Sequence, residues 1–407
     1  MASKMAHPDS ALIHHPYEPP EGFGSPQPGV FKGSTVFFPD VAAMRSREWK
    51  DKTAYTYGLH GTPTSYTLEE RLCALEGGQQ CLLVPSGLAA LGLVALSLLK
   101  SGDEVLIPDN AYGPNKAIAE GELKNWGITH QYYDPMDPED LEAQISSRTK
   151  LVWLEAAGSV TLEFPDLMAL VRVCQSRKVF TALDNTWGAG LAFSPFDLSP
   201  GSNPALGVDI SAHALTKYPS GGGDVLMGSV ITRDASLHLK LKLTHMRFGM
   251  GVGMNDVEMI LRSLPSIFLR YQAHDRTTRA LASWAQAQPE FVQVLHPALE
   301  NSPGHVHWKS LCQLDGQDRG AAGLFSVVLD ARFSQAQTDA FCDALKLFRL
   351  GYSWGGPISL VVPYELETMR KAWPKHLKSG TVVRFSVGLE ALQDLQADVQ
   401  QALCVLR

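Results

Sequence analysis

A lysine and an aspartate stand where they could act together on an amino acid. Lys217 lies just past Asp209–Ala212, a run typical of a β-strand, and Asp184 ends an earlier run of that kind, Val179–Leu183. A lysine in such a place can form a Schiff base with an aldehyde cofactor. An aspartate can hold the protonated ring nitrogen of pyridoxal phosphate (PLP), which makes that cofactor an electron sink. An enzyme acting on an amino acid is therefore the leading hypothesis.

Both residues also have an ordinary structural explanation. An aspartate after a strand is a favoured N-cap of a helix. A lysine near a strand end is usually only solvated. A buried lysine beside a cationic ring would instead have a lowered pKa and could act as a base.

Two further motifs would hold the phosphate and the ring of such a cofactor. The segment Pro85–Ala90 (PSGLAA) follows a strand-like run and opens a helix-like one. Gly87 there lets backbone N–H groups approach an anion, and Ser86 adds a hydroxyl. Tyr112 follows the next strand-like run and could stack on a planar ring. The alternatives are a common strand-to-helix turn and a tyrosine packed on the sheet edge.

Arg384 is a charged residue in an otherwise apolar strand-like run, GTVVRFS. A buried arginine needs an anion. The α-carboxylate of a substrate fits its planar fork, and so does an internal Asp or Glu in a structural ion pair.

The whole chain indicates what must position these side chains. Its 407 residues, 45% of them hydrophobic and 19% charged, predict a globular protein of two domains and an arm. A net charge of -7 argues against nucleic acid or an anionic membrane as partner. No apolar run is long enough to span a membrane, and the start lacks the apolar core of a signal peptide. The six scattered cysteines suggest reduced thiols in a cytoplasmic protein and no metal site.

Strands and helices alternate in the middle of the chain, which predicts an α/β fold with a mostly parallel, doubly wound sheet. Ligands in such sheets bind outside the carboxyl ends of the strands. The predicted parts are an arm over 1–62 that lies on a neighbouring subunit, a cofactor-binding α/β domain over 63–255 and a smaller α+β domain over 256–407. Predicted strands span 81–84, 105–108, 131–133, 151–154, 179–183, 209–212, 228–231, 324–329 and 382–387, and predicted helices 88–99, 141–145, 167–174, 338–347 and 392–406.

Together, the motifs resemble the Cys/Met-metabolism family of PLP-dependent enzymes, which has the fold-type I, aspartate aminotransferase-like architecture. The resemblance runs from about Thr35 to the end of the chain. It rests on the order and spacing of Tyr57-Gly58, Leu75–Gly78, Pro85–Gly87, Ala111-Tyr112, Leu154-Glu155, Asp184–Trp187, Thr216–Tyr218, Ser353–Gly356 and Gly388–Glu390.

The resemblance implies a role for each candidate residue. Lys217 would form the Schiff base, Asp184 would hold the ring nitrogen, and Tyr112 would stack on the ring. Lys217 or Tyr112 would take the α-proton of the substrate. The remaining implied contacts are Ser86, Gly87, Leu88, Thr216 and a neighbouring subunit's Tyr57 for the phosphate, and Arg384 with the backbone around Ser353 for the substrate carboxylate.

Tyr352-Ser353-Trp354 resembles the β-lyase branch of the family, because members that work at the γ-carbon usually have Glu-Ser-Leu there. An indole would narrow the substrate pocket, unless Trp354 only packs between the domains. The resemblance thus implies a homotetrameric carbon–sulfur β-lyase that cleaves L-cystathionine, or a related cysteine S-conjugate, to pyruvate, ammonia and a thiol such as homocysteine, in methionine synthesis. The alternatives are a γ-lyase or γ-synthase and a catalytically impaired binding protein.

The chain departs from the family pattern at four places. Leu59 stands where the family has an arm arginine that contacts the PLP phosphate of a neighbouring subunit. His60, the next residue, is the candidate to replace that contact. The loop at 199–204 is longer, and Pro265 should bend a segment that has lost a later arginine. A tyrosine that the β-lyases can place near the substrate is replaced around Met246.

Overall fold

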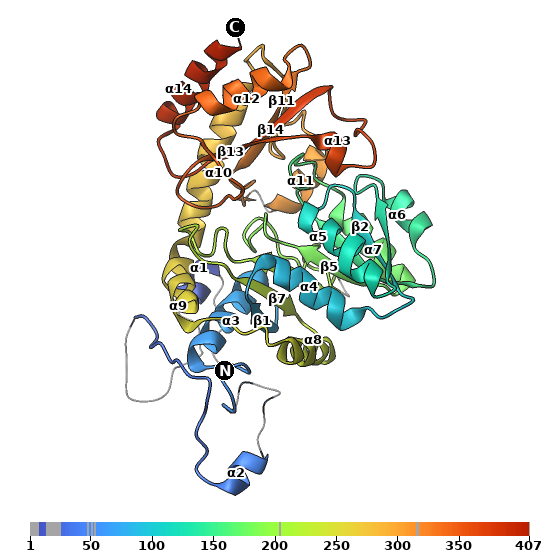
Figure 1. Ribbon diagram of the computed structural model, residues 1–407, viewed down its shortest axis with the longest axis vertical. Coiled ribbons are helices and arrows are strands. Elements are labelled where there is room, and N and C mark those ends of the chain that lie inside the picture. The colour runs from blue at the N-terminus through green and yellow to red at the C-terminus, as the bar shows by residue number, and fades with distance from the viewer. Residues whose placement is uncertain are drawn as a thin grey trace.

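The computed structural model describes residues 8–13, 26–46, 49, 52, 54–202, 205–314 and 317–406. A seven-stranded and a five-stranded sheet lie one above the other along the long axis of the molecule, and the long helix α10 (Ile267–Ala285) runs from the lower part up along one side of the upper part (Figure 1). Of the predicted arm over 1–62, residues 1–7, 14–25, 47, 48, 50, 51 and 53 lie outside the described residues.

The large sheet has the strand order β1-β7-β6-β5-β4-β2-β3. Five neighbouring strands are parallel, and β7 is antiparallel to both β1 and β6. The predicted mostly parallel fold is confirmed, and each of the seven predicted runs overlaps a strand. The strands are β1 (Gln80–Val84), β2 (Glu104–Pro108), β3 (Thr129–Tyr133), β4 (Thr149–Glu155), β5 (Phe180–Asp184), β6 (Ile210–Ala214) and β7 (Gly228–Thr232).

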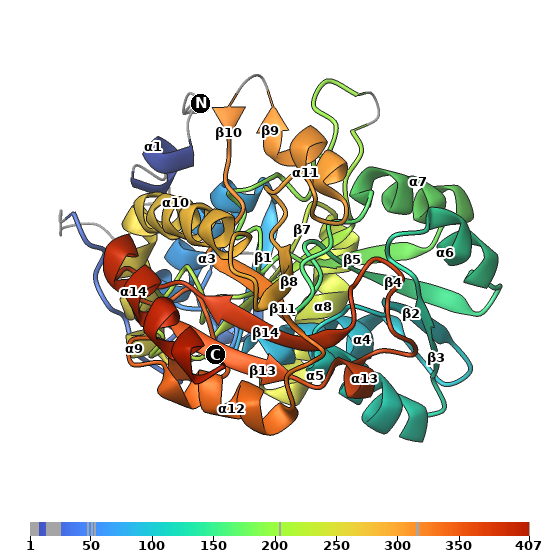
Figure 2. The same cartoon turned by 90° about the horizontal axis from the view of Figure 1, so that it is seen from above.

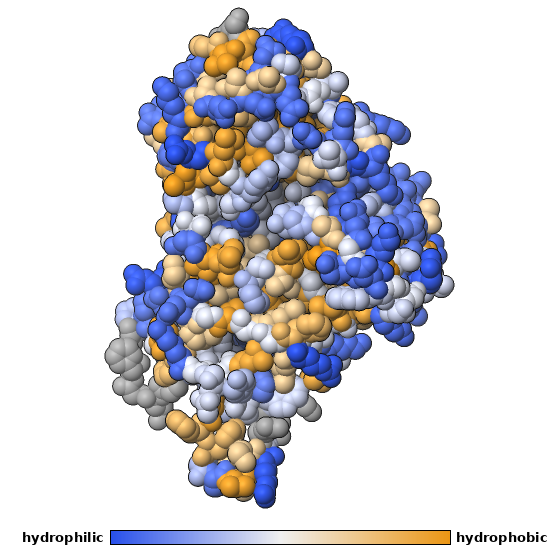
Figure 3. Space-filling view, viewed as in Figure 1, coloured by the Kyte–Doolittle hydropathy of each residue, from blue (hydrophilic) through white to orange (hydrophobic). Residues whose placement is uncertain are grey.

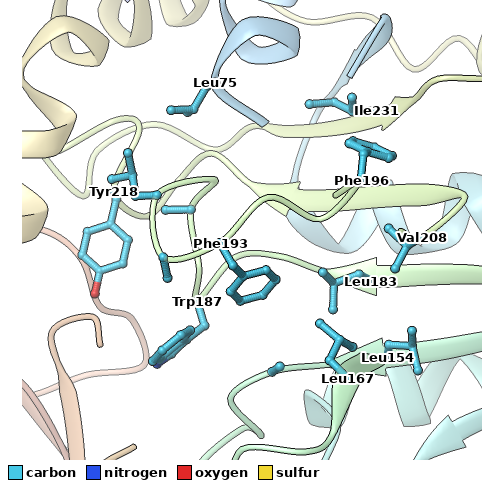
Figure 4. Close-up of a cluster of buried hydrophobic side chains, with 14 of the residues drawn as sticks. Leu75, Leu154, Leu167, Leu183, Trp187, Phe193, Phe196, Val208, Tyr218 and Ile231 are labelled. Carbon is cyan, nitrogen blue, oxygen red and sulfur yellow. The ribbon is translucent and has the colours of Figure 1, made fainter. Parts of the chain in front are cut away.

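Helices cover both faces of the large sheet, so that apolar side chains pack in two layers. One layer is shown in Figure 4, where Leu183 lies beside Phe193 and Ile231 lies beside Phe196. The opposite layer packs under α4 and α8. The helices of this part are α3 (Pro63–Glu76), α4 (Gly87–Leu98), α5 (Gly113–Ile118) with a π-helical turn over Ala119–Leu123, α6 (Pro138–Gln144), α7 (Leu167–Arg177), α8 (Ala235–Phe248) and α9 (Met254–Ser263).

Side-chain caps determine where several of these helices begin. In each, a hydroxyl or carboxylate accepts a backbone N–H bond of the first turn, which satisfies a donor that has no partner inside the helix. The capping residues are Thr62, Ser86, Asp137, Asp166 and Asp234.

The small sheet has the order β12-β13-β14-β11-β8. Its helices lie mostly on one side, away from the large sheet (Figure 2). Predicted helix 338–347 is too long, since α12 ends at Ala344 and β12 follows. The elements are β8 (Phe291–Leu295), α11 (His305–Cys312), β9 (Gln313–Leu314), β10 (Gln317–Asp318), β11 (Leu324–Asp330), α12 (Gln335–Ala344), β12 (Arg349–Leu350), β13 (Leu360–Tyr364), α13 (Leu366–Met369), β14 (Gly380–Ser386), α14 (Leu392–Ala402) and a 3₁₀ turn over Leu403–Val405.

The predicted domain boundaries remain a prediction. The first, at 62/63, coincides with the start of α3, and the second, at 255/256, falls inside α9. A 3₁₀ turn that contains Pro265 separates α9 from α10, which is where the sequence predicts a bend.

A charged cluster ties the two parts together. Arg370, just after α13, forms a buried ion pair with Glu163 and donates to Thr161 Oγ1 at 2.6 Å. Lys116 donates to the carbonyl of Met369 at 2.6 Å. Breaking a buried ion pair of this kind costs about 3–5 kcal/mol, so the cluster holds the small part in one orientation.

The described part of the arm reaches away from the body and carries the short helix α2 (Val41–Ser46) (Figure 1). Near the body, Thr35 and Tyr57 form an isolated antiparallel bridge. Helix α1 (Pro8–Ile13) contacts α3 and buries Leu12. Of the helices in the described ranges, none has the length and apolar character to cross a membrane.

Candidate active site

Lys217 follows β6 by three residues and reaches the small part of the molecule. Its Nζ donates to Ser353 Oγ at 3.0 Å and lies 5.4 Å from the centroid of the Trp354 ring. Burial and the charge of Arg384 lower the pKa of Lys217 to about 8, although Asp184 opposes them. Lys217 is therefore half-buried in a cationic setting, and the alternative of a merely solvated lysine is wrong.

Asp184 ends β5, the strand next to β6. Its Oδ1 accepts bonds from the N–H and the hydroxyl of Thr186, at 3.1 and 2.5 Å. A turn follows it instead of a helix, so the N-cap alternative is wrong. Burial raises the pKa of Asp184 in spite of the bonds from Thr186, so the ionised carboxylate needs a cationic partner here.

Tyr112 lies at the carboxyl end of the sheet, directly before α5. Its side chain is 43% exposed, so it is not packed away on the sheet edge. Its backbone N–H donates to Glu155 Oε2 at 2.8 Å. Burial and the nearby charges of Asp184 and Glu155 raise the pKa of the Tyr112 phenol.

Ser86, Gly87 and Leu88, the predicted phosphate contacts, lie at the first turn of α4. A Cβ on Gly87 would lie 2.4 Å from the Cβ of Ala214 on β6, so glycine is required for the close approach of helix and strand. Ser86 Oγ accepts the N–H of Ala89 at 3.0 Å, which leaves its hydroxyl hydrogen available. The N–H groups of Gly87 and Leu88 have no partner inside the helix.

Thr216 and Tyr57 are the other predicted phosphate contacts. Thr216 is half-buried, and its Oγ1 accepts the N–H of Met227 at 3.3 Å. Tyr57 is 46% exposed on the arm, with its ring 5.9 Å from that of His60. Both roles stay predictions.

Arg384 is 8% exposed on β14. Over the described ranges, no ion pair includes Arg384, so nothing there supports the structural ion pair that the sequence left open. The guanidinium lies 5.2 Å from the ring centroid of Tyr364. A buried cation in this setting calls for an anion from outside the chain.

The Tyr352–Trp354 segment lies between the two parts of the molecule. Tyr352 is 84% exposed. Trp354 packs edge-on against Tyr218 at 5.5 Å and also faces Lys217, so it both packs and borders the site. In the space-filling view the surface is hollowed between the upper and lower parts of the molecule (Figure 3).

Sequence reasoning missed a buried acid beneath these strand ends. Glu76, the last residue of α3, accepts from Asn185 Nδ2 at 3.0 Å and Ser211 Oγ at 2.5 Å, and lies 2.8 Å from His213 Nδ1. Interactions with His213, Ser211 and Asn185 hold the pKa of Glu76 low despite its burial. The only local signal for it is its place in the motif Leu75–Gly78.

Two of the departures from the family pattern meet in space. Leu59 and Met246 line one small cavity of about 20 Å³, with His60, Lys242 and His245 among its other walls. Met246 belongs to α8, and Leu59 to the segment that precedes α3. The arm substitution and the tyrosine replacement are therefore neighbouring changes.

The fold and these residues define an enzyme of fold-type I. The chain matches the Cys/Met metabolism PLP-dependent enzyme family over residues 9–404, and it belongs to that family. PLP is the family's cofactor. An amine of lowered pKa, a buried carboxylate and a glycine-opened helix start fit its aldehyde, ring nitrogen and phosphate.

Three relatives are similar over nearly their whole length. A Rhizobium johnstonii protein with a provisional cystathionine β-lyase name is 38% identical over 396 residues, 97% of this chain and 95% of that protein. The L-alanine/L-glutamate racemase of Wolbachia pipientis is 34% identical, and the match covers 94% of this chain and 93% of the racemase. The cystathionine β-lyase of Bordetella avium is 34% identical, and the match covers 98% of this chain and 97% of that enzyme.

Two solved structures share the fold. The metB crystal structure from Corynebacterium glutamicum has a TM-score of 0.86 and 28% identity, and covers 98% of both chains. The cystathionine γ-lyase of Lactobacillus plantarum, complexed with L-serine, also has a TM-score of 0.86, at 24% identity, and covers 98% of this chain and 99% of that one.

Proposed function

We propose that this chain is a carbon–sulfur β-lyase that cleaves L-cystathionine, or a related cysteine S-conjugate, to pyruvate, ammonia and a thiol such as homocysteine. The observation that carries the proposal is the Lys217 amine, of lowered pKa, directed at Ser353 and Trp354 of the β-lyase-type segment. Relatives named as cystathionine β-lyases support it.

The cofactor would be held at three points. Lys217 would join its aldehyde carbon, and Asp184 would bind its ring nitrogen while Tyr112 lies over the ring. The phosphate would lie at the start of α4, held by Ser86, Gly87 and Leu88 with Thr216 and a second subunit's Tyr57. When bound there, PLP withdraws electrons from the α-carbon of the substrate.

Lys217 is suited to moving the α-proton. With a pKa near 8, its Nζ is partly neutral at physiological pH and can accept a proton once it has been released from the cofactor. Tyr112 is a weaker base, since burial and nearby carboxylates raise the pKa of its phenol. We therefore assign the proton transfer to Lys217 in preference to Tyr112.

Arg384 would bind the substrate carboxylate through its planar fork, beside Ser353. That contact would fix the α-carbon near Lys217 Nζ, because Ser353 Oγ is 3.0 Å from that atom. Trp354 would narrow the side of the pocket that receives the sulfur substituent, and the exposed Tyr352 would border its entrance.

The proposal includes a homo-oligomer, a cytoplasmic location and a role in methionine synthesis. Tyr57 can serve as a phosphate ligand of another subunit only in an assembly. All six cysteines are free thiols, which suits a reducing compartment.

Product identity is the test. The purified protein with PLP and L-cystathionine is expected to give pyruvate and homocysteine, and its Lys217→Ala variant neither. Appearance of 2-oxobutyrate and cysteine would make it a γ-lyase instead. A colourless protein that stays colourless with added PLP would support the binding-protein alternative.

A second candidate is amino-acid racemisation, because the racemase relative is as similar as the Bordetella β-lyase. Removal of the α-proton is common to both reactions, and racemisation then returns it to the other face. D-alanine or D-glutamate formed from the L-amino acid, without keto acid from L-cystathionine, would favour the racemase.

A further inference from the structure

Glu155 is an acid at the carboxyl end of β4 to which the proposed chemistry gives no role. It is the register partner of Asp184 on the neighbouring parallel strand β5. Side chains of such partners point to the same face of a sheet, so two carboxylates stand side by side where the ring nitrogen would lie. Glu155 Oε2 accepts the backbone N–H of Tyr112 at 2.8 Å.

The groups around Glu155 disfavour a second negative charge. Asp184 and Glu163 repel it, whereas the N–H of Tyr112 and the charge of Arg370 favour it. Arg370, however, already forms its ion pair with Glu163. Burial and Asp184 together raise the pKa of Glu155 well above its usual range. Asp184 Oδ1 accepts two bonds from Thr186 and Glu155 accepts one from Tyr112, so Asp184 is the better stabilised anion of the pair and Glu155 the acid that keeps the proton.

We infer that Glu155 is a positioning residue which, as a neutral acid, holds the backbone of Tyr112 at the end of β4 and so fixes the tyrosine ring relative to Asp184. This inference rests on the proposed roles of Tyr112 and Asp184. A neutral acid supplies the acceptor oxygen without competing with Asp184 for the cationic ring nitrogen.

Two variants distinguish the role of the acceptor oxygen of Glu155 from that of a negative charge on its carboxylate. Glu155→Gln keeps a carbonyl oxygen and is always neutral, whereas Glu155→Met has similar length and no acceptor. The readouts are the visible circular dichroism of the bound cofactor, the pH titration of its absorption, the PLP dissociation constant and thermal unfolding.

Glu155→Gln is expected to keep the dichroic band and the titration midpoint of the parent. Glu155→Met is expected to lose much of the dichroic band, to bind PLP about tenfold more weakly, as for one lost buried hydrogen bond, and to turn over more slowly than the Gln variant. The Gln variant keeps the test decisive even where the Met variant fails to fold.

A shifted titration midpoint in Glu155→Gln would mean that Glu155 is normally an anion, and would overturn the inference. A folded Glu155→Met with the parent's dichroism and PLP affinity would overturn it too. A parent protein that does not bind PLP, or a fully active Lys217→Ala variant, would instead refute the proposed function.

Discussion

Lys217 and Arg384 are two cationic side chains close enough for the arginine to affect the lysine. Arg384 contributes to the lowered pKa of Lys217, so the lysine is easier to deprotonate because the arginine is there. Arg384 itself keeps its charge, because a guanidinium is effectively always protonated. The pair thus combines a fixed cation for binding with a titratable amine for chemistry.

The lowered pKa of Lys217 predicts how fast the apoenzyme takes up PLP at different pH values. Only the neutral amine attacks an aldehyde, and with a pKa of about 8 the neutral fraction rises from about one-tenth at pH 7 to about nine-tenths at pH 9. The rate of appearance of visible absorption should therefore rise about tenfold between pH 7 and pH 9 and level off above pH 9. A rate still climbing tenfold per unit above pH 9 would indicate an unshifted lysine.

Replacement of Arg384 should change substrate binding and the stability of the fold in opposite directions. Arg384→Met removes two charge-assisted hydrogen bonds to the substrate carboxylate, so KM for L-cystathionine should rise about 100-fold. It also removes a buried cation without an acid partner in the described structure, so the free energy of unfolding should rise by about 1 kcal/mol. Steady-state kinetics and urea unfolding test the two effects.

Arg384→Lys is the matched control, because it keeps the charge and loses the planar fork. Its KM should lie between those of the parent and of Arg384→Met. An unchanged KM in Arg384→Met would remove Arg384 from the substrate site.

At the scale of elements, the sequence predicts the strands of the large sheet and not all of their directions. Apolar runs such as Leu151–Leu154 identify a strand because burial on both faces requires them. The direction of β7 depends instead on the connection 215–227, which contains no helix in the structure. A parallel neighbour requires a crossover, usually a helix, so this loop leaves β7 antiparallel to β6.

The candidate site is predictable to a similar extent. Lys217, Asp184 and the start of α4 follow strands in local patterns that the sequence displays. The contact of Lys217 with Ser353 joins residues 136 positions apart, and no local periodicity indicates it. The partners of Glu76 lie on β6 and in the turn after β5, more than 100 positions along the chain from it, so no local pattern indicates them either.

Gly87 and Gly92 on α4 provide a test of helix–strand packing. Gly87→Ala should lower the free energy of unfolding by about 1–3 kcal/mol, because its Cβ would overlap Ala214. PLP should also bind more weakly, because the helix start must move. Urea unfolding and PLP titration measure both.

Gly92→Ala is the control in the same helix, since no atom lies within 4 Å of its added Cβ. It should stabilise the protein by about 0.5–1 kcal/mol. Equal effects at the two positions would contradict the packing account.

At the scale of the whole molecule, the arm has an apolar surface that no other residue of the described ranges covers. Phe37 is 93% exposed, and Val41 and Met44 are 55% and 46% exposed. Apolar residues gather at this end in Figure 3. Side chains of this size usually contact another surface, and a second copy of the chain is the partner that the proposed role of Tyr57 requires.

Phe37→Glu should weaken the assembly. The loss of one buried aromatic anchor should raise the subunit dissociation constant at least about tenfold, which light scattering over a dilution series measures. Val306→Glu on α11 is the control, because Val306 is 67% exposed and lies outside the arm. A monomeric parent protein would contradict the assembly itself.

The buried guanidinium of Arg384 also has a practical consequence for handling the enzyme. A buried guanidinium with no internal acid over the described ranges attracts any small carboxylate in solution. Acetate, citrate and free amino acids in a buffer would then compete with substrate. Inhibition by such salts should be competitive and should disappear in the Arg384→Met variant, so assays are best run in buffers without carboxylates.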